Sequence, residues 1–294
     1  MLSILALLSL FAADEAEKLG PTVGEIMEAA PEEVWLDPDP DQVIYIETEK
    51  GTAVVRLSSN LAQGHVEQVK TLAREHYYDG LHFYRVVHGF VAQGGDASGE
   101  KDKGSAKDSL PAEFEETAPE GFAFTPLGFA DGYAAEAGYT DGMPAGRDPE
   151  TETVWLAHCT GAFAFGRDVG RDTASTEFYI TIQPQRYLDR NLTVFGRVIY
   201  GMDAIQALPR GNFGDGGVNA DEATWTEIKS IRLESEIPEE DRIDLEYMDT
   251  SSETFRQLIT ARSARASEFF YYRPGYIDLC QMPLPVRLTP EDAE

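Results

Sequence analysis

The alternation of apolar and polar residues along the middle of the chain predicts a protein built mainly from short β-strands. Residues 42–57, QVIYIETEKGTAVVRL, hold two runs rich in Val, Ile and Tyr around a turn in which Gly51 can adopt a positive φ. This is the pattern of a β-hairpin. Further strand-like runs lie at residues 161–167, 177–183, 193–201 and 224–235. Many short strands joined by turns, with few helices, indicate an antiparallel barrel or sandwich.

Two stretches show the spacing of a helix instead. Residues 65–80 place Val66, Val69, Leu72 and Ala73 on one helical face, and Gly80 is expected to stop this helix. Near the C-terminus, Thr250 and Glu253 form a capping-box pattern ahead of a second amphipathic run.

The C-terminal tail, residues 269–287, is rich in aromatic residues and proline. We expect it to lie against the barrel, since so many exposed aromatics would form a sticky patch.

Shifts in composition divide the chain into four parts. Residues 1–13 read as the apolar part of an export signal, although no Lys or Arg precedes Lys18; the alternative is a short helix packed on the domain. Residues 14–41 form an acidic N-terminal extension, 42–235 the barrel, and 236–294 a C-terminal extension packed on it. Within the barrel, residues from about 97 to 157 are a long, weakly periodic insertion, expected to be surface excursions without a core of their own.

Charge and histidine spacing narrow the range of partners. Lys and Arg number 24 against 52 Asp and Glu, a formal net charge of -28. Such a field repels phosphate backbones and acidic lipids, so we expect no nucleic-acid partner. No apolar run is long enough for stable membrane insertion. The five histidines lack the spacing of a metal site, so no metal is expected.

The two cysteines, Cys159 and Cys280, leave two alternatives open. An exported protein permits a disulfide between them, which would tie the C-terminal tail to the body. In the chain-entropy model, closing so long a loop stabilises the fold by roughly 4–5 kcal/mol. The alternative is a pair of buried free thiols.

The stretch YYDGLHFYRVVHGFVAQGGD, residues 77–96, resembles the signature of the cyclophilins, which are peptidyl-prolyl cis–trans isomerases. The matching positions are Phe83, Arg85, Val86, Gly89, Phe90, Gln93, Gly94, Gly95 and Asp96. Residues 177–203 resemble the second core segment of the family. The resemblance implies a mainly β fold, an eight-stranded antiparallel barrel capped by two helices, here with an added C-terminal helix and tail. It places the active site on the outside of the barrel.

The same resemblance implies a role for individual residues. Arg85 is the expected catalytic donor, Phe90 lines the proline pocket, and Gln93 binds the substrate backbone and holds Arg85. The pocket is completed by positions where this chain carries Val91, Tyr179 and Leu188.

Two positions of the expected pocket depart from the family pattern. Glu177 replaces a glutamine and could pair with Arg85, either orienting it or competing with substrate. Tyr187 replaces a tryptophan. These changes affect the expected substrate preference and inhibitor sensitivity more than the reaction.

The reaction itself explains why so few polar groups suffice. Rotation about an X-Pro bond breaks no covalent bond, so neither nucleophile nor cofactor is required. A donor aimed at the prolyl nitrogen binds best when the amide is twisted, which lowers the barrier. We therefore expect a bacterial, exported, acidic isomerase that acts on proline-containing polypeptides in the periplasm. The alternative is a non-catalytic proline-binding or chaperone module on the same scaffold.

Overall fold

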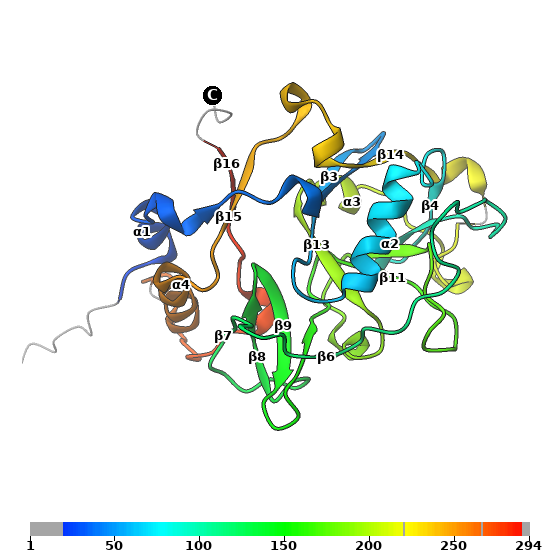
Figure 1. The fold of residues 1–294 in the computed structure, drawn as a ribbon. Coiled ribbons are helices and arrows are strands. Elements are labelled where there is room, and N and C mark those ends of the chain that lie inside the picture. Colours follow the sequence, from blue (N-terminus) through cyan, green and yellow to red (C-terminus); the bar gives the residue numbers. More distant parts are fainter. Residues whose placement is uncertain (1–19, 220, 266, 290–294) are drawn as a thin grey trace, which may run out of the picture.

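In a computed structural model, which describes residues 20–219, 221–265 and 267–289, eight antiparallel strands close into a barrel (Figure 1). Going round the barrel, the order is β11-β12-β5-β4-β14-β2-β3-β13. In chain order, the strands are β2 (Val43–Thr48), β3 (Gly51–Leu57), β4 (His82–Val86), β5 (Val91–Gly95), β11 (Ala162–Phe165), β12 (Phe178–Thr181), β13 (Val194–Tyr200) and β14 (Thr226–Leu233). The mainly β, eight-stranded barrel predicted from the sequence is confirmed.

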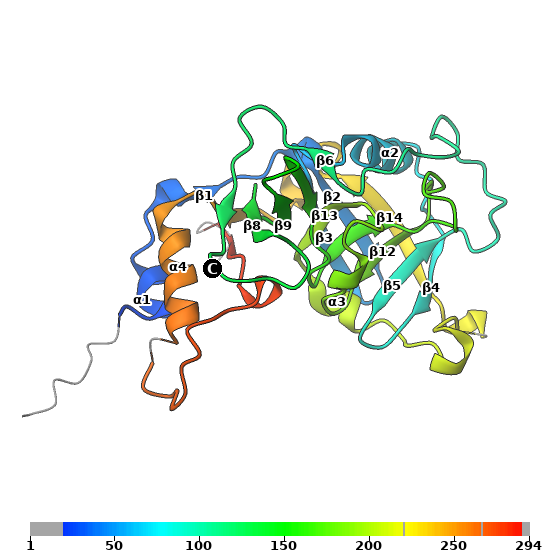
Figure 2. The same cartoon turned by 90° about the horizontal axis from the view of Figure 1, so that it is seen from below.

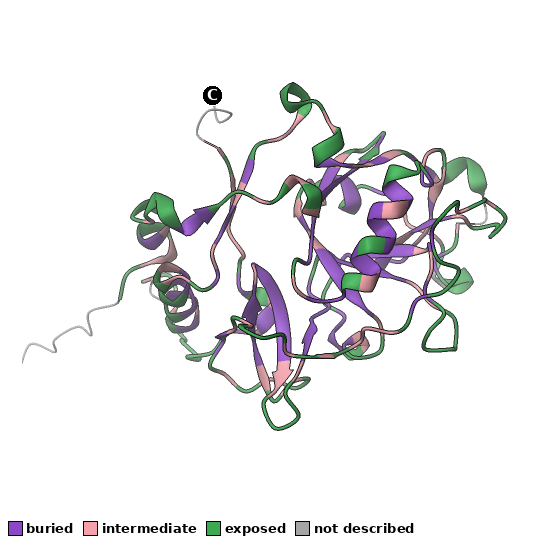
Figure 3. Cartoon of the chain, in the orientation of Figure 1, coloured by how far each residue is buried: buried purple, intermediate pink, exposed green. Residues whose placement is uncertain are grey.

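Period-two alternation explains how each strand faces two environments. Along β2, Ile44 and Ile46 point into the main core, whereas Val43 and Tyr45 pack outside with Leu245. The barrel interior is filled by aromatic and aliphatic side chains, so the purple colour of Figure 3 runs through most strands. Gly51 begins β3 with φ of 125°, a backbone conformation that favours glycine at the hairpin turn.

Two helices cap the barrel. The first, α2 (Gln63–Arg74), buries all four of the predicted apolar residues, and its contacts are with β14 and β13. It ends six residues before Gly80, because residues 75–80 form turns in which His76 also has a positive φ. The second helix is the short α3 (Met202–Gln206), which packs against β3.

The long insertion forms a sheet, contrary to the expectation of surface excursions alone. Its strands, in the order β6-β10-β9-β8-β7, are β6 (Glu116–Thr117), β7 (Thr125–Pro126), β8 (Glu136–Thr140), β9 (Met143–Asp148) and β10 (Thr153–Leu156). Tyr139 in β8 is fully buried in a second apolar cluster, together with Phe255 and other residues of the C-terminal extension. Part of the apolar surface of the insertion is thus buried by a segment that is distant in sequence.

The two extensions pack together on one side of the molecule. Helices α1 (Val23–Glu28) and α4 (Glu253–Ala264) lie side by side there, as both views show (Figures 1 and 2). Strands β1 (Trp35–Leu36), β15 (Leu245–Met248) and β16 (Val286–Leu288) form a three-stranded sheet. The C-terminal helix begins after Ser252, whose hydroxyl accepts from the amide of Phe255, so the capping box expected at Thr250 is wrong.

The C-terminal tail divides into a packed part and an exposed part. Ile277 and Leu279 are buried, and Cys280 forms a disulfide with Cys159. By contrast, Phe269, Tyr271 and Tyr272 are exposed on the loop after α4. The expectation that the aromatic tail lies against the barrel is therefore wrong for this loop, and the packed part contacts the insertion sheet.

The export signal expected at residues 1–13 lies outside the described residues. Across the part of the chain that the structure describes, no helix combines the length and apolar character needed to cross a membrane.

Candidate active site

Three neighbouring strands place Arg85, Gln93 and Tyr179 in one row on the outside of the barrel. Gln93 of β5 lies opposite Arg85 of β4 on one side and opposite Tyr179 of β12 on the other. Residues directly opposite on adjacent antiparallel strands have neighbouring side chains. The row thus brings together a cation, an amide and an aromatic ring from three separate parts of the sequence.

A β-bulge in β4 adds Tyr84 to this row. The register between β4 and β5 shifts between Phe83 and Arg85, so Tyr84 is the extra residue. A bulge re-aims side chains that strict alternation would place on opposite faces. Phe83 consequently fills the barrel core, while both Tyr84 and Arg85 line a groove on the outside.

The groove has a volume of about 450 Å³ and contains most of the residues expected from the sequence. It is lined by Tyr84, Arg85, Phe90, Val91, Gln93, Gly166, Arg167, Asp168, Thr173, Ser175, Thr176, Glu177, Tyr179, Leu188 and Leu192. Val91 and Tyr179 are buried, and Phe90 and Leu188 are half-buried, so one end of the groove is apolar. Tyr187 is the exception, because it is 58% exposed and does not line the groove.

Two contacts hold the guanidinium group of Arg85. Its Nη1 donates to Oε1 of Gln93 at 3.0 Å, and its Nε donates to the carbonyl of Gly216 at 2.9 Å. The group lies 5.6 Å from the centre of the Phe90 ring. Among the described residues Nη2 has no hydrogen-bond partner, so one end of the fork remains available to a ligand beside the apolar end of the groove.

Glu177 does not pair with Arg85, which corrects one of the sequence-based expectations. Its Oε2 instead accepts from the Tyr84 hydroxyl at 2.6 Å, and that hydroxyl accepts from Nε2 of Gln93 at 2.7 Å. The three side chains and Arg85 form a continuous chain of hydrogen bonds. Because an ionised carboxylate can only accept, it fixes the direction of every bond and turns Oε1 of Gln93 toward Arg85.

Burial raises the pKa of Glu177, and the nearby charge of Asp96 adds to this rise. Its Oε1 is buried and has no hydrogen-bond partner among the described residues. The carboxylate also abuts Gly95, where an added Cβ would lie 2.3 Å from Oε1. With φ of 142°, this position favours glycine both sterically and conformationally.

A second chain of polar groups supports the floor of the groove. Nδ1 of the fully buried His158 lies 3.0 Å from Asp189, and its Nε2 lies 2.9 Å from the Tyr179 hydroxyl. Asp189 also accepts from Arg186, which forms two 3.0 Å hydrogen bonds with Asp131 in the insertion. The insertion is thereby linked to the aromatic ring at the base of the groove.

Sequence reasoning missed these supporting residues for different reasons. Tyr84 lies inside the quoted motif, but only the bulge reveals that it shares a face with Arg85. His158 and Asp131 are distant in sequence from the groove, so no local pattern connects them to Tyr179. The described ranges contain no group of three or more His, Cys, Asp or Glu residues arranged to hold a metal ion.

The fold and the site define one class of protein. Its members are closed eight-stranded barrels with an outward-facing groove, in which one arginine lies beside an apolar pocket. Comparison with known proteins identifies the family. The family model described as cyclophilin type peptidyl-prolyl cis-trans isomerase/CLD matches residues 43–233. This chain belongs to that family, and its enzyme class is peptidyl-prolyl cis–trans isomerase.

Individual relatives agree with this assignment at low identity. A probable peptidyl-prolyl cis-trans isomerase of Brucella suis is 28% identical over 180 residues, which is 61% of this chain and 77% of the relative. The peptidyl-prolyl cis-trans isomerase-like 1 protein of Mus musculus is 27% identical over 179 residues, 61% of this chain and 84% of the relative.

A solved structure extends the similarity beyond the barrel. The cyclophilin AquaCyp293 of Hirschia baltica aligns with a TM-score of 0.72 and 24% identity, covering 92% of this chain and 98% of that one. The shared fold therefore includes most of the extensions as well as the barrel.

Proposed function

We propose that Arg85 catalyses rotation about X-Pro bonds by donating a hydrogen bond to the prolyl nitrogen. The proline ring would occupy the apolar end of the groove, against Phe90, Val91 and Tyr179. As the amide twists, resonance is lost and the nitrogen lone pair becomes an acceptor. A bond made mainly in this twisted state stabilises the transition state more than the substrate.

The observation that carries this proposal is the guanidinium group of Arg85, which is fixed in position and still has a donor without a hydrogen-bond partner among the described residues. Gln93 and Gly216 fix its position, while Nη2 has no hydrogen-bond partner in residues 20–219, 221–265 and 267–289, and Arg85 lines the groove. Fixing the donor in advance means that little reorganisation is needed when the amide twists. The chemistry requires no cofactor, since no electron, group or covalent bond is transferred.

The test is cis–trans exchange of a short X-Pro peptide, measured by NMR. We expect Arg85→Ala to lose most of the catalysis while its circular dichroism spectrum stays unchanged. Arg85→Lys should recover little, because a lysine ammonium cannot keep the bond to Gln93 and present a second donor from one planar group. Wild-type exchange at the uncatalysed rate would instead support a non-catalytic proline-binding module, the alternative that the intact donor and pocket do not favour.

We further propose that the enzyme acts on exported proteins, in the periplasm of a bacterium. The apolar start of the sequence and the disulfide between Cys159 and Cys280 support this location, since disulfides persist in oxidising compartments. Mass spectrometry of the native protein should find an N-terminus between Ala12 and Glu15. An intact Met1 would contradict cleavage of a signal.

A further inference from the structure

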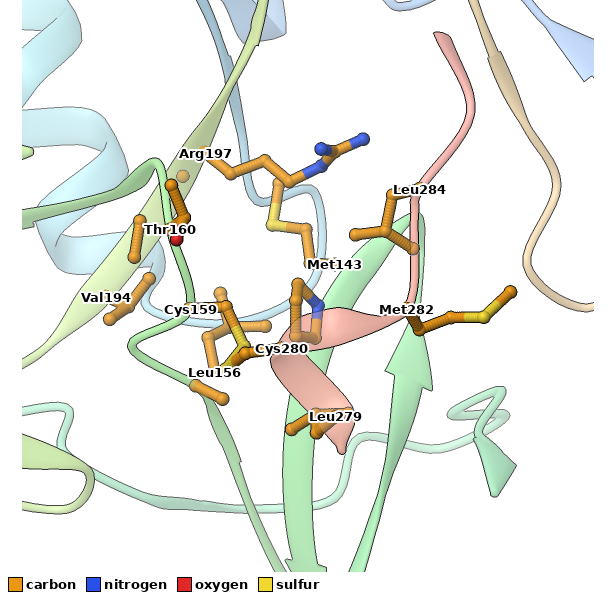
Figure 4. Close-up of a pocket in the computed structure, with 14 residues that line it drawn as sticks. Met143, Leu156, Cys159, Thr160, Val194, Arg197, Leu279, Cys280, Met282 and Leu284 are labelled. Atoms are coloured by element: carbon orange, nitrogen blue, oxygen red, sulfur yellow. A yellow bond between two sulfur atoms is a disulfide. The ribbon is translucent and has the colours of Figure 1, made fainter. Parts of the chain in front are cut away.

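A separate cavity lies where the barrel, the insertion sheet and the C-terminal tail meet (Figure 4). Its volume is about 130 Å³, and none of its lining residues also lines the proline groove. The side chains that matter most are Val194 and Arg197 from the barrel, Met143 and Leu156 from the insertion, and Met282 and Leu284 from the tail. The Cys159–Cys280 disulfide also lines the cavity, and so holds two of its walls together.

Arg197 is the charged residue of this cavity. Its side chain extends across one end, with the guanidinium group on the side of Leu284 (Figure 4). It makes no hydrogen bond or ion pair with any other described residue, and its Nε is buried without a partner. Arg56, its neighbour on β3, bonds to Asp141 and Tyr247. The two arginines lie opposite each other, yet only one has its donors satisfied.

An unpaired arginine is notable in this protein. The chain carries 52 acidic residues against 24 Lys and Arg, so acidic partners are abundant. Arg197 is half-buried, and removing part of an unpaired charge from water is unfavourable, whereas an anion beside it would offset this cost. Burial of part of the side chain, together with the charge of Arg56, lowers the pKa of Arg197.

Apart from Arg197 and Thr160, the residues that line the cavity are of apolar types. Met143, Leu156 and Val194 face it together with the disulfide and the tail. A cavity of about 150 Å³ lined by apolar side chains is large enough for a benzene-sized group. Thr160 at the rim is exposed and adds a hydroxyl at the outer side. The site therefore combines one cation with room for one compact hydrocarbon group.

We propose that this cavity binds a carboxylate that carries a compact apolar group, with the carboxylate on Arg197 and the apolar group against Met143 and Leu156. Carboxylate fits the planar fork of an arginine and forms two charge-assisted hydrogen bonds with it. A carboxylate joined to a compact apolar group is found in small branched or aromatic acids and in the C-terminal residue of a polypeptide.

The experiment uses the full chain labelled with ¹³C on its methionine methyl groups. Met143 and Met282 line the cavity, whereas Met202 packs against the barrel core and serves as an internal control. The probes are 4-methylpentanoate and a short peptide ending in leucine, each compared with its neutral amide. We expect the acids to shift Met143 and Met282 but not Met202, with a dissociation constant on the order of 1 mM for so small a ligand.

Two variants separate this site from others. Arg197→Met should weaken binding at least about tenfold, the loss expected for a charge-assisted hydrogen bond. Arg85→Ala should leave it unchanged, which excludes binding at the proline groove. If only the free acid binds, the ligand is a small molecule; if the peptide binds as well, a chain terminus also fits.

Thermal unfolding without ligand tests whether the Arg197→Met variant is folded. Because Arg197→Met replaces an unpaired, half-buried cation with an apolar side chain, it should keep or raise the midpoint of thermal unfolding. The proposal is overturned if neither acid shifts the two methyl groups, if the amides bind equally well, or if Arg197→Met binds like the wild type.

Discussion

The hydroxyl of Tyr179 lies 2.9 Å from Nε2 of His158, and this bond joins the floor of the proline groove to the interior. In the tautomer with its hydrogen on Nδ1, His158 donates to Asp189, and its Nε2 accepts from the tyrosine hydroxyl. Both ring nitrogens of a fully buried imidazole are thus satisfied. The tyrosine hydroxyl therefore has a structural purpose that a phenylalanine could not serve.

Removing this hydroxyl should destabilise the protein. Tyr179→Phe keeps the ring in the groove but leaves Nε2 of His158 buried without a donor, at a cost of about 1–3 kcal/mol. Isomerase activity should change much less than stability. Urea unfolding measures the loss, with Tyr200→Phe as control because that tyrosine lies at the surface, 41% exposed. Equal stability of Tyr179→Phe and wild type would show that the bond contributes nothing.

The contact between Tyr84 and Gln93 predicts a positioning role for Tyr84. In Tyr84→Phe, Nε2 of Gln93 loses its acceptor, so the amide is no longer held with Oε1 toward Arg85. We expect kcat to fall about fivefold with KM nearly constant. The reason is that a less well oriented Arg85 stabilises the transition state by about 1 kcal/mol less. Tyr187→Phe, which alters an exposed tyrosine outside the groove, should be fully active. Unchanged kcat in Tyr84→Phe would remove Tyr84 from the mechanism.

The raised pKa of Glu177 predicts a distinctive dependence of stability on pH. An acid whose pKa is raised on folding contributes stability below its unfolded value, 4.5, and this contribution is lost as the pH rises through the folded value. Glu177→Gln does not titrate, so the variant should gain stability relative to wild type between low and neutral pH. Urea unfolding at several pH values gives this difference. A difference that stays constant with pH would contradict the assignment.

Reduction of the Cys159–Cys280 disulfide should lower stability substantially. The bond spans 121 residues. In the chain-entropy model, opening a loop of this size costs about 4–5 kcal/mol. The midpoint of thermal unfolding should fall when a reductant is added. The double variant Cys159→Ala, Cys280→Ala should have a low midpoint that the reductant does not change. Peptide mapping without reduction should recover the two cysteines as one linked pair; two free thiols would refute the bond.

The sequence predicted those features that depend on local pattern. The hairpin around Gly51, the helix bearing Val66 and Val69, and the motif around Arg85 each lie within one short stretch, and all three are found in the structure. In the first strand of that hairpin, Ile44 and Tyr45 lie on opposite faces, as the period-two geometry of a strand requires.

The features that were missed depend on contacts between distant segments. The insertion forms a sheet because Tyr139 packs against Phe255, more than a hundred residues away. From the sequence, Glu177 could pair with Arg85, but the bulge at Tyr84 places a phenol between them. No pattern in a single sequence encodes such an intervening group.

The separation of the groove from the barrel core has an evolutionary consequence. Arg85, Gln93 and Tyr179 point outward, while Phe83 and Phe178 on the same strands fill the interior. Because closure leaves the barrel without free edges, substitutions at Arg85 and Gln93, which lie outside the barrel core, leave both the pairing of the strands and the packing within intact. The outer surface can therefore diversify toward new polypeptide clients while the scaffold is inherited almost unchanged.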